Sequence, residues 1–516
     1  KIDGSATAQI AIPEAARPGT AELFLTLSPG VLASIEPGLD SLKRYPHGCL
    51  EQTTSGLIPM VLLEDLLNGS GGDSLRTEEH RSRMQAAIAH VLRHQNGDGG
   101  FGLWPTSNSE GFLTAYGLWG LMIARDQGYS IPEGRLRDAM RYLQRNARHG
   151  DDMHGQFSSQ ETAPFAAYVL AQAERDDQGL ATNLAGEAQT LSRFSLGLLA
   201  HALEGGTASN EPLFQALSQA QVQRAGGTLI DEANEGGVMR YGTDLRATAS
   251  AVQALVAADR LDEAERLVAG ILGQRNTGGS WGTTYNNLWA LIALHSYTQA
   301  AERNEGPTRV TVEIAGQTLG TYSVGGDQRM VQLTLGADRL PAPGSSVALT
   351  FRTTGRQEAR YSARLRYALP AEAQAPASEG FHVRRELFDA ESGAAVETPE
   401  VGQLLRVRLT VRTDTSLQQV ALVDRIPAGF EPIDTRLATV ASSQRTRRSY
   451  HWSWQEIHDE RVSFFANHLR QGTHQAEYLV RANRSGRFTR PAATAEAMYD
   501  PTIWGRGAIE EIEVRR

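Results

Sequence analysis

The sequence is poor in cysteine, since Cys49 is the only one in the chain. A disulfide within the chain is therefore excluded, and so is a zinc site built from several cysteines. A single thiol fits a reducing compartment. It fits equally well an exported protein that keeps one thiol for chemistry, so composition leaves the compartment open.

Long apolar runs and an excess of positive charge are also missing. No run approaches the ~18 apolar residues of a membrane-spanning helix. The first residues, Lys1 to Ser5, lack the apolar core of a signal peptide. The net charge of -9 gives no electrostatic reason to expect nucleic acid or an anionic membrane as partner. The chain does not begin with Met, so we expect a piece of a longer protein.

The composition that remains is that of a globular protein, with 41% hydrophobic and 21% charged residues. Single cores rarely grow beyond ~250–300 residues, so several domains are expected. Residues 1–34 alternate like strands, residues 35–305 carry Ala-rich amphipathic segments between Gly-rich turns, and residues 306–372 alternate again. A linker is predicted at 371–379. We predict a helical domain inserted into a small β-domain made from both its flanks, then a separate β-sandwich over 373–516.

The helical region contains a repeated turn. Gln95-Asn-Gly-Asp-Gly-Gly-Phe-Gly102 and Gln274-Arg-Asn-Thr-Gly-Gly-Ser-Trp-Gly282 each end one helix, carry an aromatic residue and precede another helix. One helical hairpin cannot bury its apolar face alone, so repeated hairpins predict a closed ring of paired helices, an α/α-toroid. Trp104 and Trp281 are expected to pack between hairpins rather than to act in catalysis.

The residues that carry chemistry lie in the run Tyr45-Pro-His-Gly-Cys-Leu-Glu-Gln52. A thiol and a carboxamide three residues apart can close a ring if the chain turns between them. Attack of the Cys49 sulfur on the Gln52 side-chain carbonyl expels ammonia and leaves an internal thioester. Thiolate leaves readily, so this carbonyl is a stronger electrophile than an amide. The apolar spacing from Leu57 to Leu62 predicts a helix just after Gln52, whose dipole would favour the thiolate.

A bare Cys-x-x-Gln more often holds a buried structural cysteine. The complete string Gly48-Cys-Leu-Glu-Gln52, with an aromatic residue and a proline before it and a helix after it, resembles the thioester motif of the α2-macroglobulin and complement family. Leu50 is the form typical of bacterial α2-macroglobulins. Gly48, Leu50 and Glu51 then support the Cys49–Gln52 bond.

The order of domains resembles the same family. There, a β-sandwich CUB domain is interrupted by the α/α-toroid thioester domain and followed by the last, receptor-binding-like macroglobulin domain. The resemblance assigns residues 1–34 and 306–372 to the CUB-like domain. It assigns 35–305 to the thioester domain and 373–516 to the terminal β-sandwich.

The resemblance implies a broad-spectrum protease inhibitor, not an enzyme. In the family a protease cuts a bait region, the molecule rearranges, and a lysine amine of the protease attacks the exposed glutaminyl carbonyl. Gln52 would be the acyl donor and Cys49 the leaving group, without cofactor or metal.

Bacterial members of the family are periplasmic and commonly lipid-anchored to the inner membrane. They are thought to work beside a peptidoglycan-synthesising penicillin-binding protein. We expect a monomer whose bait region and lipid anchor lie before Lys1.

An exposed thioester would hydrolyse, so bulky apolar side chains should cover it. Tyr45 lies four residues before Cys49 and can fold back over it. The run Glu496-Ala-Met-Tyr-Asp500 resembles the segment in which family members place Met and Tyr against the thioester. Met498 and Tyr499 are therefore predicted to cover a second side.

Histidines bear on which nucleophile is acylated. Complement members that prefer hydroxyls carry a histidine in the stretch corresponding to residues 155–164, which has none here, so amines are expected. His47 and His154 are expected to be surface or turn residues. His90 and His94 lie one helical turn apart, a spacing that can bind metal. No third ligand is evident, so a solvated helix face is expected there.

Two other classes stay open from the sequence. An α/α-toroid enzyme such as a cyclase or lyase would need acidic clusters at the ring centre, whereas Asp151-Asp152 and Asp176-Asp177 resemble loop pairs. A thioester adhesin would carry the same bond, but the order of β and helical regions argues against it.

Overall fold

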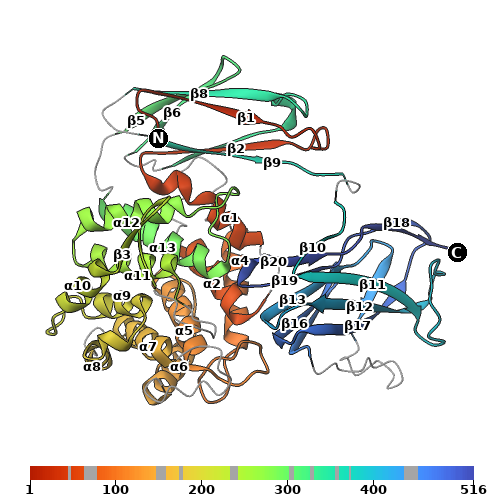
Figure 1. Cartoon of the computed structure of the whole chain (residues 1–516), viewed down its shortest axis with the longest axis horizontal. Helices are drawn as coiled ribbons and strands as arrows, with labels where there is room; N and C mark the ends of the chain where they lie inside the picture. Colours follow the sequence, from red (N-terminus) through yellow and green to blue (C-terminus); the bar gives the residue numbers. More distant parts are fainter. Residues whose placement is uncertain are drawn as a thin grey trace. The chain divides into compact units, whose positions relative to one another are not determined.

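The computed structural model describes residues 1–44, 48–62, 78–146, 159–173, 178–232, 242–301, 307–325, 330–354, 359–370, 374–434 and 451–516. These residues form two compact units. The first combines Lys1–Glu14 with Pro18–Tyr367, and the second combines Ala15–Arg17 with Ala368–Arg516. Figure 1 shows helices and a β-sandwich in the first unit and strands in the second. Within these ranges, no helix has the length and apolarity needed to cross a membrane.

The helices of the first unit form a closed ring of two layers. Contacts run from α2 through α5, α7, α9 and α11 to α13, and from α13 back to α2. The inner layer holds α2 (Leu50–Leu62), α5 (Gly111–Asp126), α7 (Ser159–Ala173), α9 (Arg193–Ala202), α11 (Asp244–Ala257) and α13 (Thr284–Ala301). The outer layer holds α1 (Glu36–Arg44), α4 (Glu78–Arg93), α6 (Glu133–Asn146), α8 (Gly179–Ala185), α10 (Glu211–Gln219) and α12 (Leu261–Gly273). The predicted α/α-toroid is confirmed.

The two layers differ in how much of each helix is buried. Inner helix α5 is buried on nearly every face, whereas outer helix α6 buries only Leu136, Ala139 and Leu143. A helix that is apolar all round belongs inside a fold, and one with a single apolar stripe belongs on its surface. The sequence thus sorts the helices into layers.

Aromatic side chains fill the centre of the ring. Trp119 of α5 stacks on Trp289 of α13 with ring centroids 5.0 Å apart, and Phe194 of α9 meets Trp289 edge-on at 4.9 Å. Phe165 of α7 contacts both tryptophans. All four side chains are buried. Such pairs contribute about 0.5–1.5 kcal/mol beyond their buried area.

The repeated turn has the same geometry in both copies. The carbonyl of Asn96 accepts from the N–H of Gly99 at 3.1 Å, and that of Asn276 accepts from the N–H of Gly279 at 2.9 Å. Gly99 has φ +94° and Gly279 has φ +82°, a region that glycine adopts without steric cost. The internal repeat in the sequence therefore corresponds to a repeated structure.

The turn aromatics pack against helices, as expected. Trp281 is buried, and its Nε1–H donates to the Ile271 carbonyl at 2.7 Å. A Cβ on Gly38 would lie 2.7 Å from the Trp281 ring, so glycine there lets α1 approach the turn. Trp104 is buried as well.

The helical prediction for 35–305 misses one hairpin. Strands β3 (Gln221–Arg224) and β4 (Gly227–Ile230) pair antiparallel and pack against α12. A Cβ on Gly270 of α12 would lie 1.9 Å from the Thr228 carbonyl oxygen, so Gly270 permits this contact. The hairpin depends on a close approach between segments that local periodicity does not show.

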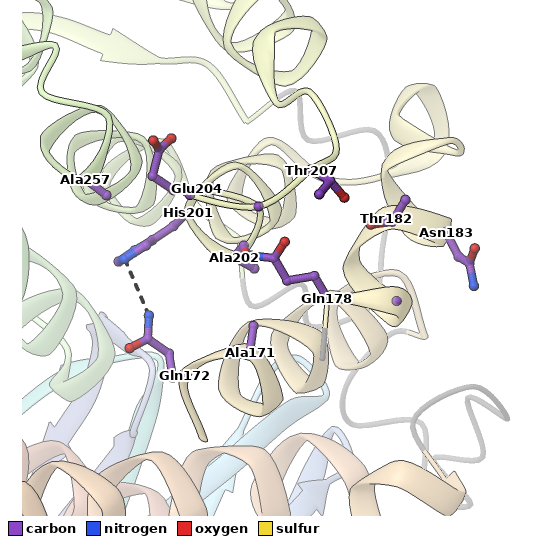
Figure 2. Close-up of a pocket in the computed structure, with 13 residues that line it drawn as sticks. Ala171, Gln172, Gln178, Thr182, Asn183, His201, Ala202, Glu204, Thr207 and Ala257 are labelled. Atoms are coloured by element: carbon purple, nitrogen blue, oxygen red, sulfur yellow. Dashed lines mark hydrogen bonds between the residues drawn. The ribbon is translucent and has the colours of Figure 1, made fainter. Parts of the chain in front are cut away.

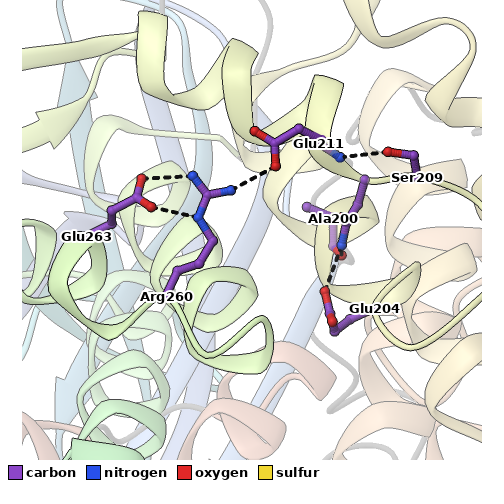
Figure 3. Close-up of polar contacts among 7 residues, drawn as sticks. Ala200, Glu204, Ser209, Glu211, Arg260 and Glu263 are labelled. Atoms are coloured by element: carbon purple, nitrogen blue, oxygen red, sulfur yellow. Dashed lines mark hydrogen bonds and ion pairs between the residues drawn. The ribbon is translucent and has the colours of Figure 1, made fainter.

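On the outer layer, Arg260 links the starts of two helices (Figure 3). It donates to both carboxylate oxygens of Glu263 at 2.6 and 3.0 Å, and to Glu211 at 3.2 Å. Glu263 lies in the first turn of α12 and Glu211 in the first turn of α10. Partly exposed pairs of this kind contribute little stability, about 0–1 kcal/mol each.

The β-sandwich of the first unit is built from both flanks of the ring. Sheet order is β1-β8-β5-β6 in one layer and β7-β2-β9 in the other. Strands β1 (Ser5–Ala11) and β2 (Glu22–Ser28) precede the ring and pair with strands that follow it, which confirms the predicted insertion. The later strands are β5 (Thr308–Ile314), β6 (Gln317–Val324), β7 (Val331–Leu335), β8 (Ser346–Thr354) and β9 (Arg360–Arg366).

Arg364 attaches this sandwich to the helix that leads into the Cys49 loop. From strand β9 it donates to Asp40 at 2.6 Å and to Glu36 at 2.8 Å, both on α1. Its guanidinium lies over the Phe24 ring of β2 at 5.0 Å. The direction in which α1 points is thus set by the sandwich.

The second unit is a separate β-sandwich. Its sheets have the orders β10-β20-β19-β13-β16-β15, β11-β12-β17-β14 and β18-β21. Part of the predicted linker at 371–379 is instead strand β10, which pairs with β20 across a long sequence separation. The strands are β10 (Ala377–Glu379), β11 (Phe381–Asp389), β12 (Leu404–Thr413), β13 (Leu417–Arg425), β14 (Phe430–Ile433), β15 (Trp454–His458), β16 (Arg461–Leu469), β17 (Gly472–Ala482), β18 (Gly486–Arg490), β19 (Thr494–Ala497), β20 (Asp500–Arg506) and β21 (Glu510–Val514).

Candidate functional site

N-termini of inner helices gather at the end of the ring that carries Cys49. Thr284, at the start of α13, bonds Glu51 at the start of α2. Glu161, in the first turn of α7, accepts from the N–H of Gly242, just before α11. Glu232 accepts from the first two amides of α9. A helix N-terminus carries partial positive charge, and the acidic side chains of Glu51, Glu161 and Glu232 accept from donors at these helix starts.

Cys49 lies at the N-cap position of α2. Its Sγ accepts from the N–H of Gln52 at 3.5 Å, and its carbonyl accepts from the N–H of Thr53 at 3.0 Å. The helix therefore begins at Leu50, not after Gln52 as the apolar spacing predicted. The sulfur takes the place of the hydroxyl oxygen in a capping box, Ser/Thr-x-x-Glu/Gln. The reciprocal bond of that motif, from the first backbone N–H to the fourth side chain, is not formed by Gln52, whose Oε1 has no hydrogen-bond partner among the described residues. The sulfur therefore caps the backbone of Gln52 and leaves its side-chain carbonyl unbonded.

Gln52 is a buried carboxamide whose polar atoms have no hydrogen-bond partner among the described residues. Its side chain is 5% exposed, and both Nε2 and Oε1 are unsatisfied. An unsatisfied buried donor or acceptor costs about 1–3 kcal/mol. Loss of ammonia would remove the unsatisfied NH₂ group altogether. The site thus holds an amide poorly and suits an acyl group that lacks the amide nitrogen.

Glu51 is fully buried and joins three inner helices. Its carboxylate accepts from Ser55 Oγ at 2.5 Å, one turn along α2, and from Thr284 Oγ1 at 2.8 and 3.1 Å. The Ser55 hydroxyl in turn lies 2.7 Å from the Tyr116 hydroxyl of α5. Sequence reasoning found Glu51 as part of the motif but missed its partners. Thr284 lies 233 residues away, and nothing local indicates the contact.

The residues on either side of Cys49 are held by the segment that begins at the end of α4. His90 Nε2 contacts the Gly48 carbonyl at 2.6 Å, and the N–H of Leu50 donates to the Leu103 carbonyl at 3.1 Å. Leu50 itself is buried. The predicted motif residues Gly48, Leu50, Glu51 and Gln52 therefore lie together around Cys49.

The expectation of a solvated face at His90 and His94 is wrong. His94 is fully buried, and burial, with a smaller effect of His90, lowers its pKa to about 4. His90 is half-buried against the Cys49 loop. Among the described residues, no group of three or more His, Cys, Asp and Glu side chains is placed to hold a metal ion.

Several predicted residues are not tested by this geometry. Tyr45, His47 and His154 lie outside the described residues. Met498 is buried and Tyr499 half-buried in the turn between β19 and β20 of the second unit. Their proposed role in covering the thioester stays a prediction.

A pocket of about 1180 Å³ lies elsewhere on the ring, at the C-terminal ends of α7 and α9 (Figure 2). Its lining includes His201, whose Nε2 lies 3.4 Å from the Gln172 amide nitrogen. Burial lowers the pKa of His201 to about 4, so its imidazole is neutral near pH 7. Among the described residues that line the pocket, Glu204 is the only acidic one. The pocket does not contain the thiol and is not the candidate site.

Sequence models of two protein domains match this chain. Residues 26–167 match the A-macroglobulin TED domain, and residues 380–502 match the bacterial α2-macroglobulin MG10 domain. The chain belongs to the bacterial α2-macroglobulin family.

Individual members of the family show the same relationship. α2-Macroglobulin of Escherichia coli K12 is 25% identical over 97% of this chain. The structure of Salmonella α2-macroglobulin reacted with methylamine has a TM-score of 0.77 and 25% identity, and covers 99% of this chain and 33% of its own. A native Escherichia coli structure that spans domain MG7 to the C-terminus has a TM-score of 0.73 at 23% identity, and the match covers 99% of this chain and 81% of that one. This chain spans 30% of the length of the Escherichia coli protein.

Proposed function

We propose that Cys49 and Gln52 form an internal thioester, through which the whole protein traps attacking proteases covalently. The observation that carries the proposal is the buried, unpartnered carboxamide of Gln52, three residues after an N-cap thiol. Membership of the α2-macroglobulin family supports the same conclusion.

Thioester formation is a balanced acyl transfer. The Cys49 sulfur bonds to Cδ of Gln52, the Cδ–Nε2 bond breaks, and ammonia leaves with the thiol proton. The helix N-termini around Cys49 favour the thiolate that attacks. The N-cap position places the thiol three residues before the carboxamide in one folded segment, so the reaction is intramolecular and gains from proximity.

Capture reverses the roles of sulfur and nitrogen. A lysine amine of the protease attacks Cδ of Gln52, the C–S bond breaks, and Cys49 leaves as a thiolate that takes up the proton from nitrogen. An amide bond to the protease remains, and no catalyst is regenerated. We propose that cleavage of a bait region elsewhere in the protein exposes the bond. The Salmonella relative is described as reacted with methylamine, a small amine of the same chemistry.

An α/α-toroid enzyme is the less favoured alternative. Cyclases and lyases of this architecture would need an open ring centre, whereas Trp119, Phe194 and Trp289 fill the centre here. The protein is therefore proposed to act as an inhibitor that reacts once, not as an enzyme. A thioester adhesin would share the bond, but the matches to α2-macroglobulin domains disfavour it.

The remaining features of the family are proposals for this protein. They are a periplasmic location, a lipid anchor to the inner membrane and action as a monomer beside a penicillin-binding protein. The assignment of 1–34 with 306–372, of 35–305 and of 373–516 to separate family domains is proposed on the same grounds.

Intact mass under denaturing conditions tests the thioester. We expect the purified chain to be lighter by one ammonia than its sequence requires. Methylamine should add its own mass and release one thiol, and Cys49→Ala should show neither change. A chain of full mass, with Gln52 unmodified in peptide mapping and Cys49 titrating as a thiol, would contradict the proposal. A hydrolysed bond is distinguished because Gln52 then reads as Glu.

A further inference from the structure

We infer that His90 is a positioning residue for the thioester, because it holds the Gly48–Cys49 peptide in the orientation that closure of the thioester needs. The inference rests on the proposed function. His90 lies in the last turn of α4 and reaches the site loop across 42 residues of sequence.

The contacts of His90 define which nitrogen carries its proton. Arg93 approaches His90 Nδ1 at 2.5 Å, and the Gly48 carbonyl lies 2.6 Å from Nε2. A guanidinium only donates hydrogen bonds, so Nδ1 must accept. Nε2 therefore carries the hydrogen and donates it to the Gly48 carbonyl. These two contacts fix one tautomer of His90.

The groups around His90 fit this tautomer. The Arg93 guanidinium is positively charged, and His94 lies beside His90 with ring centroids 5.2 Å apart. The pKa of His94 is lowered to about 4, so His94 supplies no charge near pH 7. Protonation of His90 at Nδ1 would place two donors against each other and break the bond from Arg93.

The bond from His90 completes a set of restraints on the backbone around Cys49. His90 holds the Gly48 carbonyl, the Leu103 carbonyl holds the N–H of Leu50, and the N–H of Thr53 holds the Cys49 carbonyl. Each restraint comes from a different element. The peptide that leads into Cys49 would otherwise be free to rotate, because Gly48 has no side chain to limit it.

Restraint of this peptide matters because the thioester can form only when the thiol is placed to attack the Gln52 side-chain carbonyl. A misplacement of about 1 Å far from the reacting atoms can cost about 100-fold in rate. His90 touches neither reacting atom. It acts through the Gly48 carbonyl, and loss of its donor should lower the fraction of chains that close the thioester.

The test compares two substitutions of similar size in the 516-residue chain. His90→Leu removes the donor, whereas His90→Gln retains an N–H donor at a comparable reach. His382→Leu, at an exposed position of the second unit, is the matched control. The readouts are the fraction of chain lighter by one ammonia, and the amount of thiol that methylamine releases. Thermal unfolding reports on the fold.

We expect the fraction of chains that carry the thioester to fall about tenfold in His90→Leu, because that is the size of effect expected when one hydrogen bond is lost. This fraction should be close to the wild-type value in His90→Gln and equal to it in His382→Leu. Unfolding temperatures should agree within about 3 °C. A wild-type fraction in His90→Leu overturns the role of His90 alone. Equal losses in the Leu and Gln variants also overturn it, because they indicate packing rather than the donor. A wild-type chain without the mass loss overturns the thioester and this role together.

Discussion

The Thr284 hydroxyl donates to the Glu51 carboxylate at 2.8 Å, which joins the first inner helix of the ring to the last. Glu51 lies between Cys49 and Gln52, the two residues proposed to form the thioester bond. The residue that closes the ring is therefore also the residue that orients the site. We propose that this contact is the reason for an acidic side chain in the motif, since Glu51 has no part in the proposed acyl transfer.

Removal of the Thr284 hydroxyl should weaken the ring and the site together. Thr284→Val keeps the shape but removes the donor, so we expect a loss of about 1.5–3 kcal/mol in the free energy of unfolding, the range for hydrogen bonds to charged groups. Thr284→Ser retains the hydroxyl and should lose much less. Urea unfolding followed by tryptophan fluorescence measures both. Equal losses in the two variants would show that the methyl group, not the bond to Glu51, carries the effect.

Substitution of Cys49 separates its chemical role from its capping role. Cys49→Ser and Cys49→Ala should both abolish the mass loss and the release of thiol by methylamine. Serine is a strong N-cap and alanine is a weak one, so the Ser variant should be more stable by about 0.5–2 kcal/mol. Thermal unfolding compares the pair. Covalent protease adducts in either variant of the whole protein would place the chemistry elsewhere.

Shielding of the thioester predicts faster attack when the cover is removed. Tyr45→Gly, and separately Met498→Ala/Tyr499→Ala, should increase the rate of thiol release by methylamine, because bulk and low polarity exclude small nucleophiles. Met330→Ala/Tyr322→Ala is a matched control, since Met330 is buried and Tyr322 half-buried in the other sandwich. Release at the wild-type rate in either test variant would exclude that element from the cover.

The stability of the ring of helices should fall as pH rises from about 4.5 to about 7. Burial, with a further contribution from Glu161, raises the pKa of Glu232 from 4.5 to about 7. The folded state therefore binds this proton more tightly than the unfolded state. Its contribution is fully present below pH 4.5 and is lost as pH approaches 7, a change of up to about 3 kcal/mol.

Urea unfolding of the wild type and of Glu232→Gln between pH 5 and 8 measures this dependence. The substitution should flatten the curve, since amide and carboxylic acid are both neutral. Glu263→Gln, at a partly exposed ion pair, is the control and should keep the wild-type slope. A wild-type slope in Glu232→Gln would assign the pH dependence to another group.

The second unit should depend on a buried ion pair. Arg385 donates to Asp424 at 2.5 Å, and Tyr478 donates to the same carboxylate at 2.7 Å. Burial raises the pKa of Asp424, although Arg385 opposes the shift. Arg385→Met leaves a buried charge without its partner and should cost about 3–5 kcal/mol. Arg385→Met/Asp424→Asn should recover part of that loss. Calorimetry of the chain measures both, and a double variant no better than the single one would contradict this view.

The sequence predicts features whose cause is local. The alternation of Thr308–Ile314 and the apolar spacing of Arg83–Leu92 correspond to β5 and α4, because each pattern reflects the burial of one face. The repeated turn is predictable for the same reason, since its glycines meet a conformational need within the turn. The chemistry of a thiol and a carboxamide three residues apart suggested Cys49 and Gln52, but the resemblance of the whole string to the family motif carried the assignment, which stays a prediction.

The features that the sequence does not reveal depend on distant partners. Strand β10 forms by pairing with β20, the β3–β4 hairpin forms against α12, and His90 meets Gly48 across 42 residues of sequence. The start of α2 was misplaced for a different reason. A sulfur atom replaces the usual hydroxyl as N-cap, and a rule based on Ser, Thr, Asp and Asn does not recognise it.

The bond between Glu51 and Thr284 also has a consequence for biosynthesis. A chain emerging from the ribosome exposes Cys49 and Gln52 early, but their neighbour Glu51 has no Thr284 to bind until a further 233 residues have followed. Contacts of such long separation form late in folding. We therefore expect the proposed thioester to form only after the ring of helices around it is complete.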